Sequence, residues 1–476
     1  MSSLKIGWAK VDITPIPVLA KKVSLIGQFH ERIAEKVRDP IYVTVMVLDD
    51  EKSLPSIIIS ADLVMITKEL MDEVRKELKA LLPDMPPAAL LISATHIHTG
   101  PYINGLDIWG KRFSFSCKDP EVLTPDTFRD FFAEKTAVAA AEAWRSRKTG
   151  GIALKLGRIA VPQCRRVQYK DGTSQMYGAT DTPDFLRVEG NADNGAEYLI
   201  TYDTDGKITG LIINLACPAQ IVEMEQYITA DLWGEVREQM GEIPYVLPLC
   251  GAAGDLAMRD LVRRDRTEAS TRSEEGIYEI AGRITRESKF IISTVKKEEI
   301  LFDIPYQHLF RNIQLPLRAV TEEDYIQAER DLSALEADYE QNALEKESPD
   351  SYPLRMKDRV EYTKLAAIVE RNKMQKKDRN ISMELHAVRV GNAVLVSNPF
   401  ELYQEYGNQI KALSPAPYTF VAQLSCDCLG YLPNELAITG GGYSTEVADS
   451  YVGPEGGDVL VAKTLDAILT VWSGPK

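Results

Sequence analysis

Short apolar runs alternate along the chain with stretches whose apolar residues follow helical spacing. Runs rich in Ile, Val and Leu predict strands at 6–13, 42–48, 56–61, 88–94, 152–161, 197–202, 210–215, 245–249, 382–390, 393–397 and 418–423. Helical spacing and capping residues predict helices at 67–82 and 124–147, after Asp231, from about Glu401 and from about Asp458. Strands interspersed with helices throughout predict an α/β fold, with mixed β-sheets packed together and flanked by helices.

One segment departs from this alternation. From about 321 to 377 the chain is rich in charged, helix-forming residues, with a break at 348–353 that contains two prolines. This pattern predicts an inserted helical hairpin, either on the surface or at a contact of a homo-oligomer. No internal sequence repeat is present, so we expect a single domain over residues 1–476.

Composition and charge narrow the class of protein. The 476 residues are 45% hydrophobic and 26% charged, which is ordinary for a globular chain and excludes a disordered one. Lys and Arg number 55 and Asp and Glu number 70, so the net charge of −15 repels phosphate backbones and anionic lipids. We therefore expect a small-molecule substrate, and neither a nucleic-acid nor a membrane partner.

The cysteines and the start of the chain bear on its location. No secretory segment precedes the first charges, no apolar window reaches transmembrane length, and six scattered cysteines do not suggest a secreted disulfide framework. We therefore expect a cytoplasmic protein. Cys426 and Cys428 could form a redox pair, an extra metal site or two buried thiols, and buried thiols are the commonest of these states.

The sharpest local feature is a pair of histidines after the apolar run 88–94, in Thr95-His96-Ile97-His98-Thr99-Gly100-Pro101. In extended backbone, residues i and i+2 point to the same side, so His96 and His98 can converge on one ion or substrate. The end of a buried strand is also a usual place for a ligand in an α/β sheet. The plain alternative is that both histidines cap a turn through hydrogen bonds.

Polar residues follow other apolar runs in the same way. Asp255 follows 245–249 in a glycine-rich stretch, where it is either close to a ligand or a helix cap. Glu401 follows 393–397, where it is either a functional carboxylate or a charge at a helix N-terminus. Tyr431 and Tyr443 lie in glycine-rich stretches, and each alone is more often a packing residue.

Several common catalytic motifs are absent from the sequence, including G-x-S-x-G, a Walker-type phosphate loop, H-E-x-x-H and paired C-x-x-C. Taken together, the segments that are present resemble the neutral/alkaline (non-lysosomal) ceramidase family in its N-terminal catalytic domain. The stretch 6–15 is similar to that family's opening strand, and 95–101 is similar to its T-H-x-H-[ST]-G-P signature. The β-sandwich domain that follows in ceramidases is not expected here.

The resemblance implies a zinc site and its surroundings. It implies that His96, Glu401 and Tyr431 bind zinc, together with a second histidine. The residues that match its other active-site positions are His98 at the substrate carbonyl, Arg165, Tyr443 and Asp255.

This sequence departs from the family pattern in two places. The second zinc histidine should lie in 214–218, where none is present, and Cys217 is our candidate replacement because thiolate binds zinc well. Glu223 and Asp231 are alternative oxygen donors. The family's serine is Ala257 here, so covalent serine catalysis at that position is excluded.

The mechanism consistent with both departures is metal-assisted hydrolysis, in which a metal, taken as zinc, lowers the pKa of its water. Glu401 or Asp255 would transfer the proton, and His98, Arg165 and Tyr443 would stabilise the carbonyl oxygen. The acidic balance and the absence of an export signal favour an amide or ester of a soluble polar compound over ceramide. The alternatives are a metal-assisted lyase or isomerase acting on a sugar, and a non-catalytic binding protein that has lost its metal.

Overall fold

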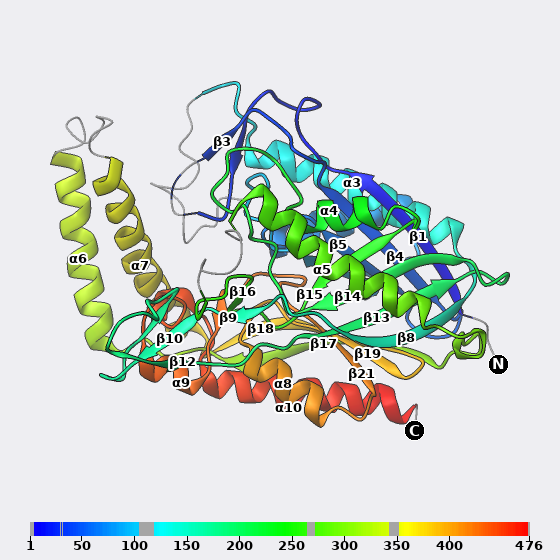
Figure 1. Ribbon diagram of the computed structural model, residues 1–476. Helices are drawn as coiled ribbons and strands as arrows, with labels where there is room; N and C mark the ends of the chain where they lie inside the picture. The colour runs from blue at the N-terminus through cyan, green and yellow to red at the C-terminus, as the bar shows by residue number, and fades with distance from the viewer. Residues whose placement is uncertain are drawn as a thin grey trace.

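The computed structural model describes residues 4–28, 30, 32–103, 119–263, 272–341 and 352–474. Its centre consists of three β-sheet units of the same topology, each covered by its own pair of helices (Figure 1). In each unit, three antiparallel strands are followed by a helix, a fourth strand parallel to the third, and a second helix. The three units follow one another along the chain.

The first unit spans roughly the N-terminal third of the chain. Its elements are β1 (Lys5–Asp12), β4 (Tyr42–Asp49), β5 (Ser56–Ala61), α1 (Lys68–Leu81), β6 (Leu90–Ala94) and α3 (Pro125–Ser146), with the short β7 (Lys148–Thr149) beside β1. Helix α1 buries the face formed by Leu70, Met71, Val74 and Leu78. Thr67 caps its N-terminus by accepting from the Leu70 N–H, and this capping explains where the helix begins.

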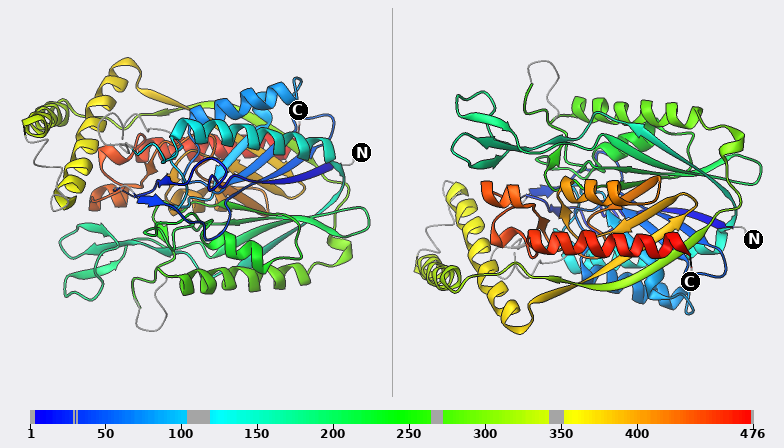
Figure 2. Two further views of the ribbon diagram at one scale, coloured as in Figure 1. Left: turned by 90° about the horizontal axis from the view of Figure 1, so that it is seen from above. Right: turned by 90° about the horizontal axis from the view of Figure 1, so that it is seen from below.

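The second and third units repeat this plan. The second contains β8 (Gly151–Arg158), β13 (Gly195–Tyr202), β14 (Ile208–Leu215), α4 (Leu232–Gln239), β15 (Val246–Cys250) and α5 (Glu274–Ser293). The third contains β17 (Tyr306–Pro316), β18 (Asn380–Val390), β19 (Ala393–Ser397), α8 (Gln404–Leu413), β21 (Tyr418–Ala422) and α10 (Pro454–Ser473). Helices α8 and α10 cover the outer side of the third sheet (Figure 2).

Each unit carries its insertion between its first and second strands. The inserted elements are β2 (Val23–Leu25) and β3 (Arg32–Ala34) in the first unit; β9 (Gln163–Cys164), β10 (Arg166–Tyr169), β11 (Ser174–Met176) and β12 (Phe185–Val188) in the second; and α6 (Glu322–Gln341) and α7 (Tyr352–Lys377) in the third. The first strand of each unit runs in the same direction as its two parallel strands. The insertions therefore begin at the sheet edge where the parallel strands end.

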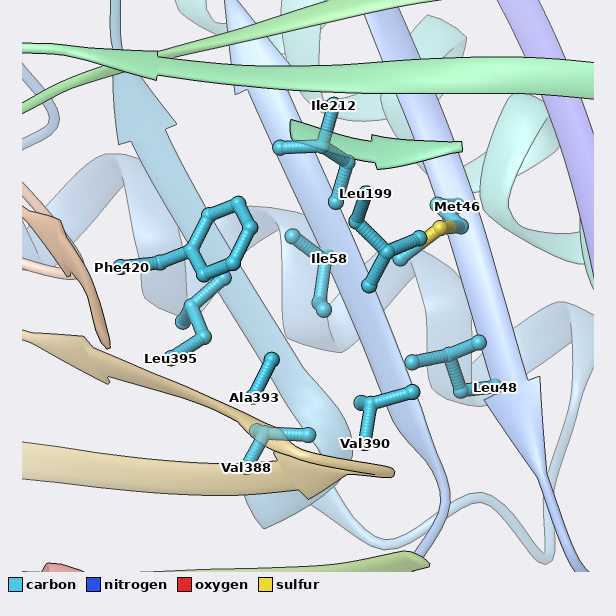
Figure 3. A pocket seen from close by; sticks show the side chains of 10 residues that line it. All are labelled: Met46, Leu48, Ile58, Leu199, Ile212, Val388, Val390, Ala393, Leu395 and Phe420. Carbon is cyan, nitrogen blue, oxygen red and sulfur yellow. The ribbon is translucent and has the colours of Figure 1, made fainter. Parts of the chain in front are cut away.

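The three sheets pack against one another through apolar faces. A small cavity between them is lined by side chains from all three units (Figure 3), namely Met46, Leu48, Ile58, Leu199, Ile212, Val388, Val390, Ala393, Leu395 and Phe420. Because sheets meet on one face and helices cover the other, strands such as β5 are buried along their whole length. This explains the continuous apolar runs in the sequence.

The predicted α/β fold with mixed sheets and flanking helices is confirmed. Two long elements were not predicted, β17 and α5. Strand β17 contains polar residues and alternates between buried and exposed positions, so it has no apolar run to detect. The helix expected from about Glu401 begins at Gln404, because Glu401 and Leu402 form β20, which pairs with β22 (Tyr431–Leu432).

The segment expected to be a helical hairpin contains α6 and α7, which pack against each other away from the sheets (Figure 1). The end of α7 nearest the sheets is anchored by Arg371, which is 3% exposed. Its guanidinium donates to the carbonyls of Val447, Ser450 and Tyr451. In the described part of the chain, no helix has the length and apolar character needed to cross a membrane.

Candidate functional site

The site lies where strands from different units end at the same edge. His96 follows β6, Glu401 follows β19, and Tyr431 begins β22 after β21. The His96 Nε2 atom lies 3.2 Å from Oε2 of Glu401, and Glu401 pairs with Tyr431 in the β20–β22 ladder. Three of the four predicted zinc ligands therefore come together from two units of the fold.

Backbone contacts fix the ring of His96. Its φ is 67°, a left-handed conformation that is uncommon for a residue other than glycine. The ring Nδ1 lies 2.6 Å from the carbonyl oxygen of Val64. Because a carbonyl only accepts, Nδ1 donates to Val64, and Nε2 is the ring atom that faces Glu401.

The carboxylate of Glu401 is partly exposed, at 15% of its side chain, and charged. Burial raises its pKa, but the charge and hydrogen bond of His96, the charge of Arg165 and the Tyr431 hydroxyl together hold this pKa below its ordinary value. Arg165 NH2 lies 3.9 Å from Glu401 Oε2. The site therefore keeps a carboxylate anion in place with a cation close by.

Arg165 enters the site from the insertion of the second unit, between β9 and β10. It is 5% exposed, and its guanidinium donates to the carbonyl of Gly254 at 2.8 Å and to the Tyr431 hydroxyl at 3.4 Å. Burial lowers its pKa, yet interactions with Tyr177, Tyr431 and Glu401 raise it well above the ordinary value. Arg165 therefore stays charged inside the protein.

Tyr443 completes this cluster from the segment that follows α9 (Glu435–Gly440). Its hydroxyl lies 3.4 Å from that of Tyr431, and the two rings meet edge to face at 5.5 Å. Burial, followed by the charge of Glu401, raises the pKa of Tyr443. Burial and the charge of Glu401 also raise the pKa of Tyr431 well above its ordinary value, so both hydroxyls stay protonated near neutral pH.

His98 lies beside His96, with their rings edge to face and their centroids 5.1 Å apart. The His98 Nε2 atom is 2.9 Å from the side-chain nitrogen of Gln220, and Nδ1 is 3.6 Å from Oε2 of Glu223. Burial, followed by the charges of His96, Arg32 and Arg165, lowers the pKa of His98 well below its ordinary value. His98 is therefore neutral at physiological pH.

The candidate replacement ligand Cys217 does not join this group. Among the described residues, the one set of three His, Cys, Asp or Glu donors within 4.8 Å of one another lies elsewhere and does not include Cys217. The Cys217 thiol is fully buried in the apolar core and lies 3.6 Å from the carbonyl of Pro218. Burial, followed by Cys250 and Asp231, raises its pKa well above the ordinary value, which keeps it a thiol.

The two alternative oxygen donors have other partners. Glu223 lies beside His98, and its other oxygen is 3.1 Å from NH2 of Arg272. Asp231 caps α4, accepting from the N–H groups of Leu232 at 2.7 Å and Val222 at 2.9 Å. Neither carboxylate faces His96 as Glu401 does.

Asp255 contacts both Arg165 and Gln404. Its carbonyl accepts from the Arg165 N–H at 2.9 Å, and its side-chain Oδ1 accepts from the Gln404 N–H at 2.8 Å. Burial raises the pKa of Asp255 to about 6. Asp255 therefore connects the strand-end segment of the second unit to the start of α8 in the third.

A small recess, with room for about one water molecule, lies next to His98. It is lined by Tyr177, Gln220, Glu223, Ala257, Met258, Arg259 and Arg272. The methyl group of Ala257 thus occupies the wall of this recess, at the position where the resemblance implies serine. The side-chain oxygen of Gln220 is buried and has no hydrogen-bond partner among the described residues.

The sequence did not reveal Gln28, Gln220 or Tyr177. Gln220 lies three residues after Cys217 and contacts His98, while Tyr177 accepts from Arg165 at 3.3 Å. The Gln28 amide nitrogen lies 3.4 Å from Nδ1 of His98. No local pattern marks these residues, because their roles depend on contacts that form only when separate segments meet in the folded chain.

No protein-family model and no curated protein matches the chain. Two ceramidases are among the solved structures that are similar to it. A neutral ceramidase from Pseudomonas aeruginosa aligns with 100% of this chain and 76% of its own, with a TM-score of 0.69 and 16% identity. A ceramidase complexed with C2 aligns with 99% of this chain and 76% of its own, with a TM-score of 0.68 and 14% identity. The chain therefore has a ceramidase-like fold.

Proposed function

We propose that this chain is a metal-dependent hydrolase, with zinc as the metal, that cleaves an amide or ester bond in a polar substrate. The observation that carries the proposal is the approach of His96 Nε2 to Glu401 Oε2 at 3.2 Å inside the protein. Tyr431 lies in the same cluster. A nitrogen, a carboxylate oxygen and a phenol oxygen form a donor set that suits zinc.

The geometry of these donors fits a cation. Nδ1 of His96 donates to Val64, so the close contact between Nε2 and the Glu401 carboxylate needs either a second proton on the ring or a cation between the two atoms. Zinc–nitrogen and zinc–oxygen bonds of about 2.0–2.1 Å place two ligands of a tetrahedral ion about 3.3 Å apart. The separation of 3.2 Å is close to that value.

Bound zinc would supply a Lewis acid that polarises a carbonyl group and makes water more acidic. Side chains of the protein would stabilise the charge that develops on the substrate. Charged Arg165 and the protonated hydroxyl of Tyr443 would donate to a carbonyl oxygen as it gains negative charge. Each well-placed donor of this kind contributes roughly 3–4 kcal/mol to stabilising the transition state.

Neutral His98 would act as a hydrogen-bonding group rather than as a cation. The Gln220 contact on one ring nitrogen and the Glu223 contact on the other hold the ring in a fixed orientation. Asp255 supports Arg165 through its backbone and would keep the guanidinium in position. We therefore treat Asp255 as a positioning residue.

The lining of the recess beside His98 supports a polar substrate. Arg259, Arg272 and Glu223 carry charge there, and the Gln220 oxygen is an acceptor that a substrate hydroxyl or amine could satisfy. An acyl chain bound there would remove water from these charged groups and would offer them no hydrogen bonds in return. This lining favours an amide or ester with hydroxyl or acidic groups over a ceramide.

The test is the metal content of protein purified without chelator, measured by mass spectrometry. We expect Glu401→Gln and His96→Ala to bind one zinc fewer per chain than wild type. Glu405→Gln is the matched control, because it makes the same chemical change four residues away on the exposed side of α8. Equal zinc in Glu401→Gln and Glu405→Gln would refute the proposed metal site.

A non-catalytic binding protein is the second candidate, and one observation favours it. The position expected for the fourth ligand offers only Cys217, whose thiol belongs to the apolar core. In that case the polar residues around the small recess beside His98 would hold part of a polar ligand in metal-free protein. Calorimetry with a panel of hydroxylated acids and amides would then give the same binding for wild type and for His96→Ala.

A further inference from the structure

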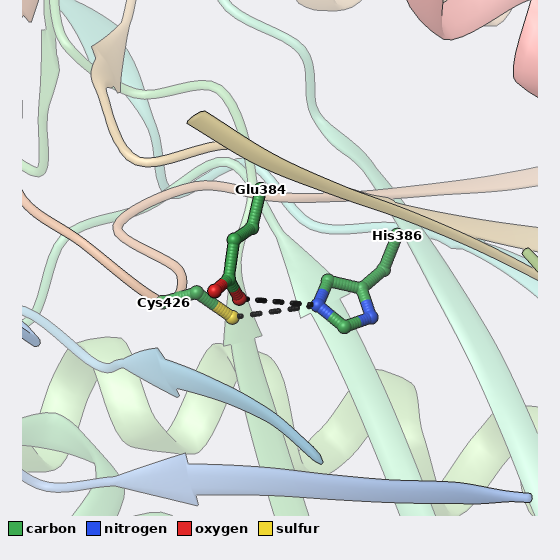
Figure 4. Close-up of side chains that lie close together, drawn as sticks. All are labelled: Glu384, His386 and Cys426. Carbon is green, nitrogen blue, oxygen red and sulfur yellow. Dashed lines mark hydrogen bonds and ion pairs between the residues drawn. The ribbon is translucent and has the colours of Figure 1, made fainter. Parts of the chain in front are cut away.

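A second cluster of donor side chains lies away from His96 and Glu401. Glu384 and His386 project from the same face of β18, and Cys426 approaches them from the segment after β21 (Figure 4). A carboxylate oxygen, the imidazole nitrogen and the sulfur all lie within 4.8 Å of one another. Among the described residues, no other group of three His, Cys, Asp or Glu donors is this close.

A chain of hydrogen bonds determines which nitrogen of His386 carries the proton. The Nδ1 atom of His308 lies 2.9 Å from the carbonyl oxygen of Pro55, which only accepts, so His308 donates from Nδ1. Its Nε2 must then accept from Nδ1 of His386, which lies 3.0 Å away. The remaining nitrogen, His386 Nε2, therefore presents a lone pair to the cluster.

That lone pair faces the other two donors. His386 Nε2 lies 3.8 Å from the Cys426 sulfur and 3.8 Å from Oε2 of Glu384. Zinc–sulfur and zinc–nitrogen bonds of about 2.3 and 2.0 Å correspond to a sulfur–nitrogen separation of about 3.5 Å. Shifts of a few tenths of an ångström would thus bring the three donors onto one ion.

The charges of the cluster suit a divalent cation. Arg75 of α1 binds both oxygens of Glu384, at 2.7 and 2.6 Å, and holds the carboxylate in one orientation. A second lone pair on each oxygen is still available to a metal. With a thiolate, a carboxylate and one guanidinium, the protein part carries a net charge of −1, which partly neutralises the ion.

Cys426 is held towards the cluster by its backbone. Its N–H donates to the carbonyl of Ile92 in β6 at 2.9 Å, and its φ is 64°. The residue is 3% exposed. The cluster therefore joins β18 of the third unit, the segment after β21, and β6 of the first unit.

We propose that Glu384, His386 and Cys426 form a second metal site, selective for zinc or a similar borderline-soft divalent ion, with water as its fourth ligand. A thiolate and an imidazole favour such ions over magnesium or calcium, which prefer oxygen. Binding replaces the S–H bond of Cys426 with a sulfur–metal bond and releases one proton to solvent. All three ligands belong to the third unit, and Arg75 and Ile92 of the first unit contact two of them. The proposal shares no ligand with the site at His96 and does not depend on the proposed function.

Cobalt(II) titration of metal-free protein tests this site, because a cobalt–thiolate bond gives a charge-transfer absorption in the near ultraviolet. We expect this band in wild type and in Cys428→Ser, the matched control two residues away. We expect no band in Cys426→Ser and at least a tenfold weaker metal affinity in Glu384→Gln. A wild-type protein that binds cobalt without the band would overturn the proposal.

Two further measurements separate this site from the first one. If the thiolate band disappears in Cys217→Ala but remains in Cys426→Ser, the thiolate belongs to the site at His96 and the second site is refuted. X-ray absorption on zinc-loaded wild type removes any dependence on variant folding, and it must show sulfur bound to zinc. Absence of sulfur from the zinc coordination would contradict the proposal even if both variants fail to fold.

Discussion

At the scale of single residues, the site depends on side chains whose charge state is set by their burial partners. Arg165 stays charged because Tyr177, Tyr431 and Glu401 surround it, and Glu401 stays ionised because His96 and Arg165 offset its burial. Removing one of these neighbours would change the charge state of the group beside it. Substitutions here should therefore affect activity more than folding.

Replacing Arg165 with lysine tests the role of the guanidinium. Lysine keeps the charge but cannot donate at the same time to the Gly254 carbonyl and towards Tyr431, as Arg165 does. We expect kcat/KM with chromogenic esters of polar acids to fall by about 100-fold, as for the loss of one oxyanion donor. The melting temperature should change little, and an unchanged kcat/KM would contradict the role given to Arg165.

Sequence motifs predicted the site residues that lie at strand ends. They did not predict the residues that are brought to the site only by tertiary packing. His96, Glu401 and Tyr431 each follow a recognisable apolar run or glycine-rich segment, and they come together. Cys217 follows such a run too, but its thiol lies in the core. The direction of a side chain after a strand depends on tertiary packing, which a single sequence does not show.

The reason why His96 and His98 converge also differs from the one expected. From the spacing we expected extended backbone at both histidines. In the structure, His96 instead has a φ of 67°. The rings still meet, at 5.1 Å, because Val64 fixes one and Gln220 contacts the other. Spacing alone therefore identified the right residues for an incomplete physical reason.

At the scale of elements, the segment between β14 and α4 is held by the carboxylate of Asp231. This residue caps α4 and also accepts from Val222, close to Gln220 and Glu223. Burial raises its pKa from 3.8 to about 6. Between these values the folded protein binds the proton more tightly than the unfolded chain does, so this group makes the free energy of unfolding fall as pH rises.

Asp231→Asn removes this titrating group. We therefore expect the free energy of unfolding to depend less on pH in the variant than in wild type. A shift of this size corresponds to a change of order 2–3 kcal/mol between pH 4 and pH 7. We expect the variant to lose most stability relative to wild type at pH 4 and least at pH 7, measured by urea denaturation. Asp205→Asn is the control, since it makes the same change on an exposed turn. Parallel curves for wild type and Asp231→Asn would contradict the assignment.

The base of the helical hairpin is a second element with a structural role. Arg371 of α7 donates to three carbonyls of 447–451, a segment that also bridges to Gly430, next to Tyr431. Arg371→Ala would leave these buried carbonyls without partners and should lower the free energy of unfolding by about 3 kcal/mol. The exposed Arg330→Ala on α6 should cost less than about 0.5 kcal/mol. Chemical denaturation of both variants checks this, and equal costs would contradict it.

At the scale of the whole molecule, three units of one topology meet with their parallel strands ending at the candidate site. The repeat was not predicted, because the sequence carries no internal repeat and the shared feature is only the order and direction of the strands. The fold class could be predicted, since continuous apolar runs such as 56–61 require sheets covered on both faces. Insertions at the same point of each unit then supply Gln28 and Arg165 to the site.

A metal at His96, Glu401 and Tyr431 is central to the proposed hydrolysis. The most direct measurement is the rate of release from chromogenic esters and anilides of polar acids by chelated protein, followed during stepwise return of zinc. We predict that wild type and Glu405→Gln lose activity on chelation and regain it with zinc, whereas Glu401→Gln stays at least 100-fold slower, as for the loss of about 2.7 kcal/mol of transition-state stabilisation. Full activity in chelated wild type, or a Glu401→Gln protein as fast as Glu405→Gln, would contradict the account.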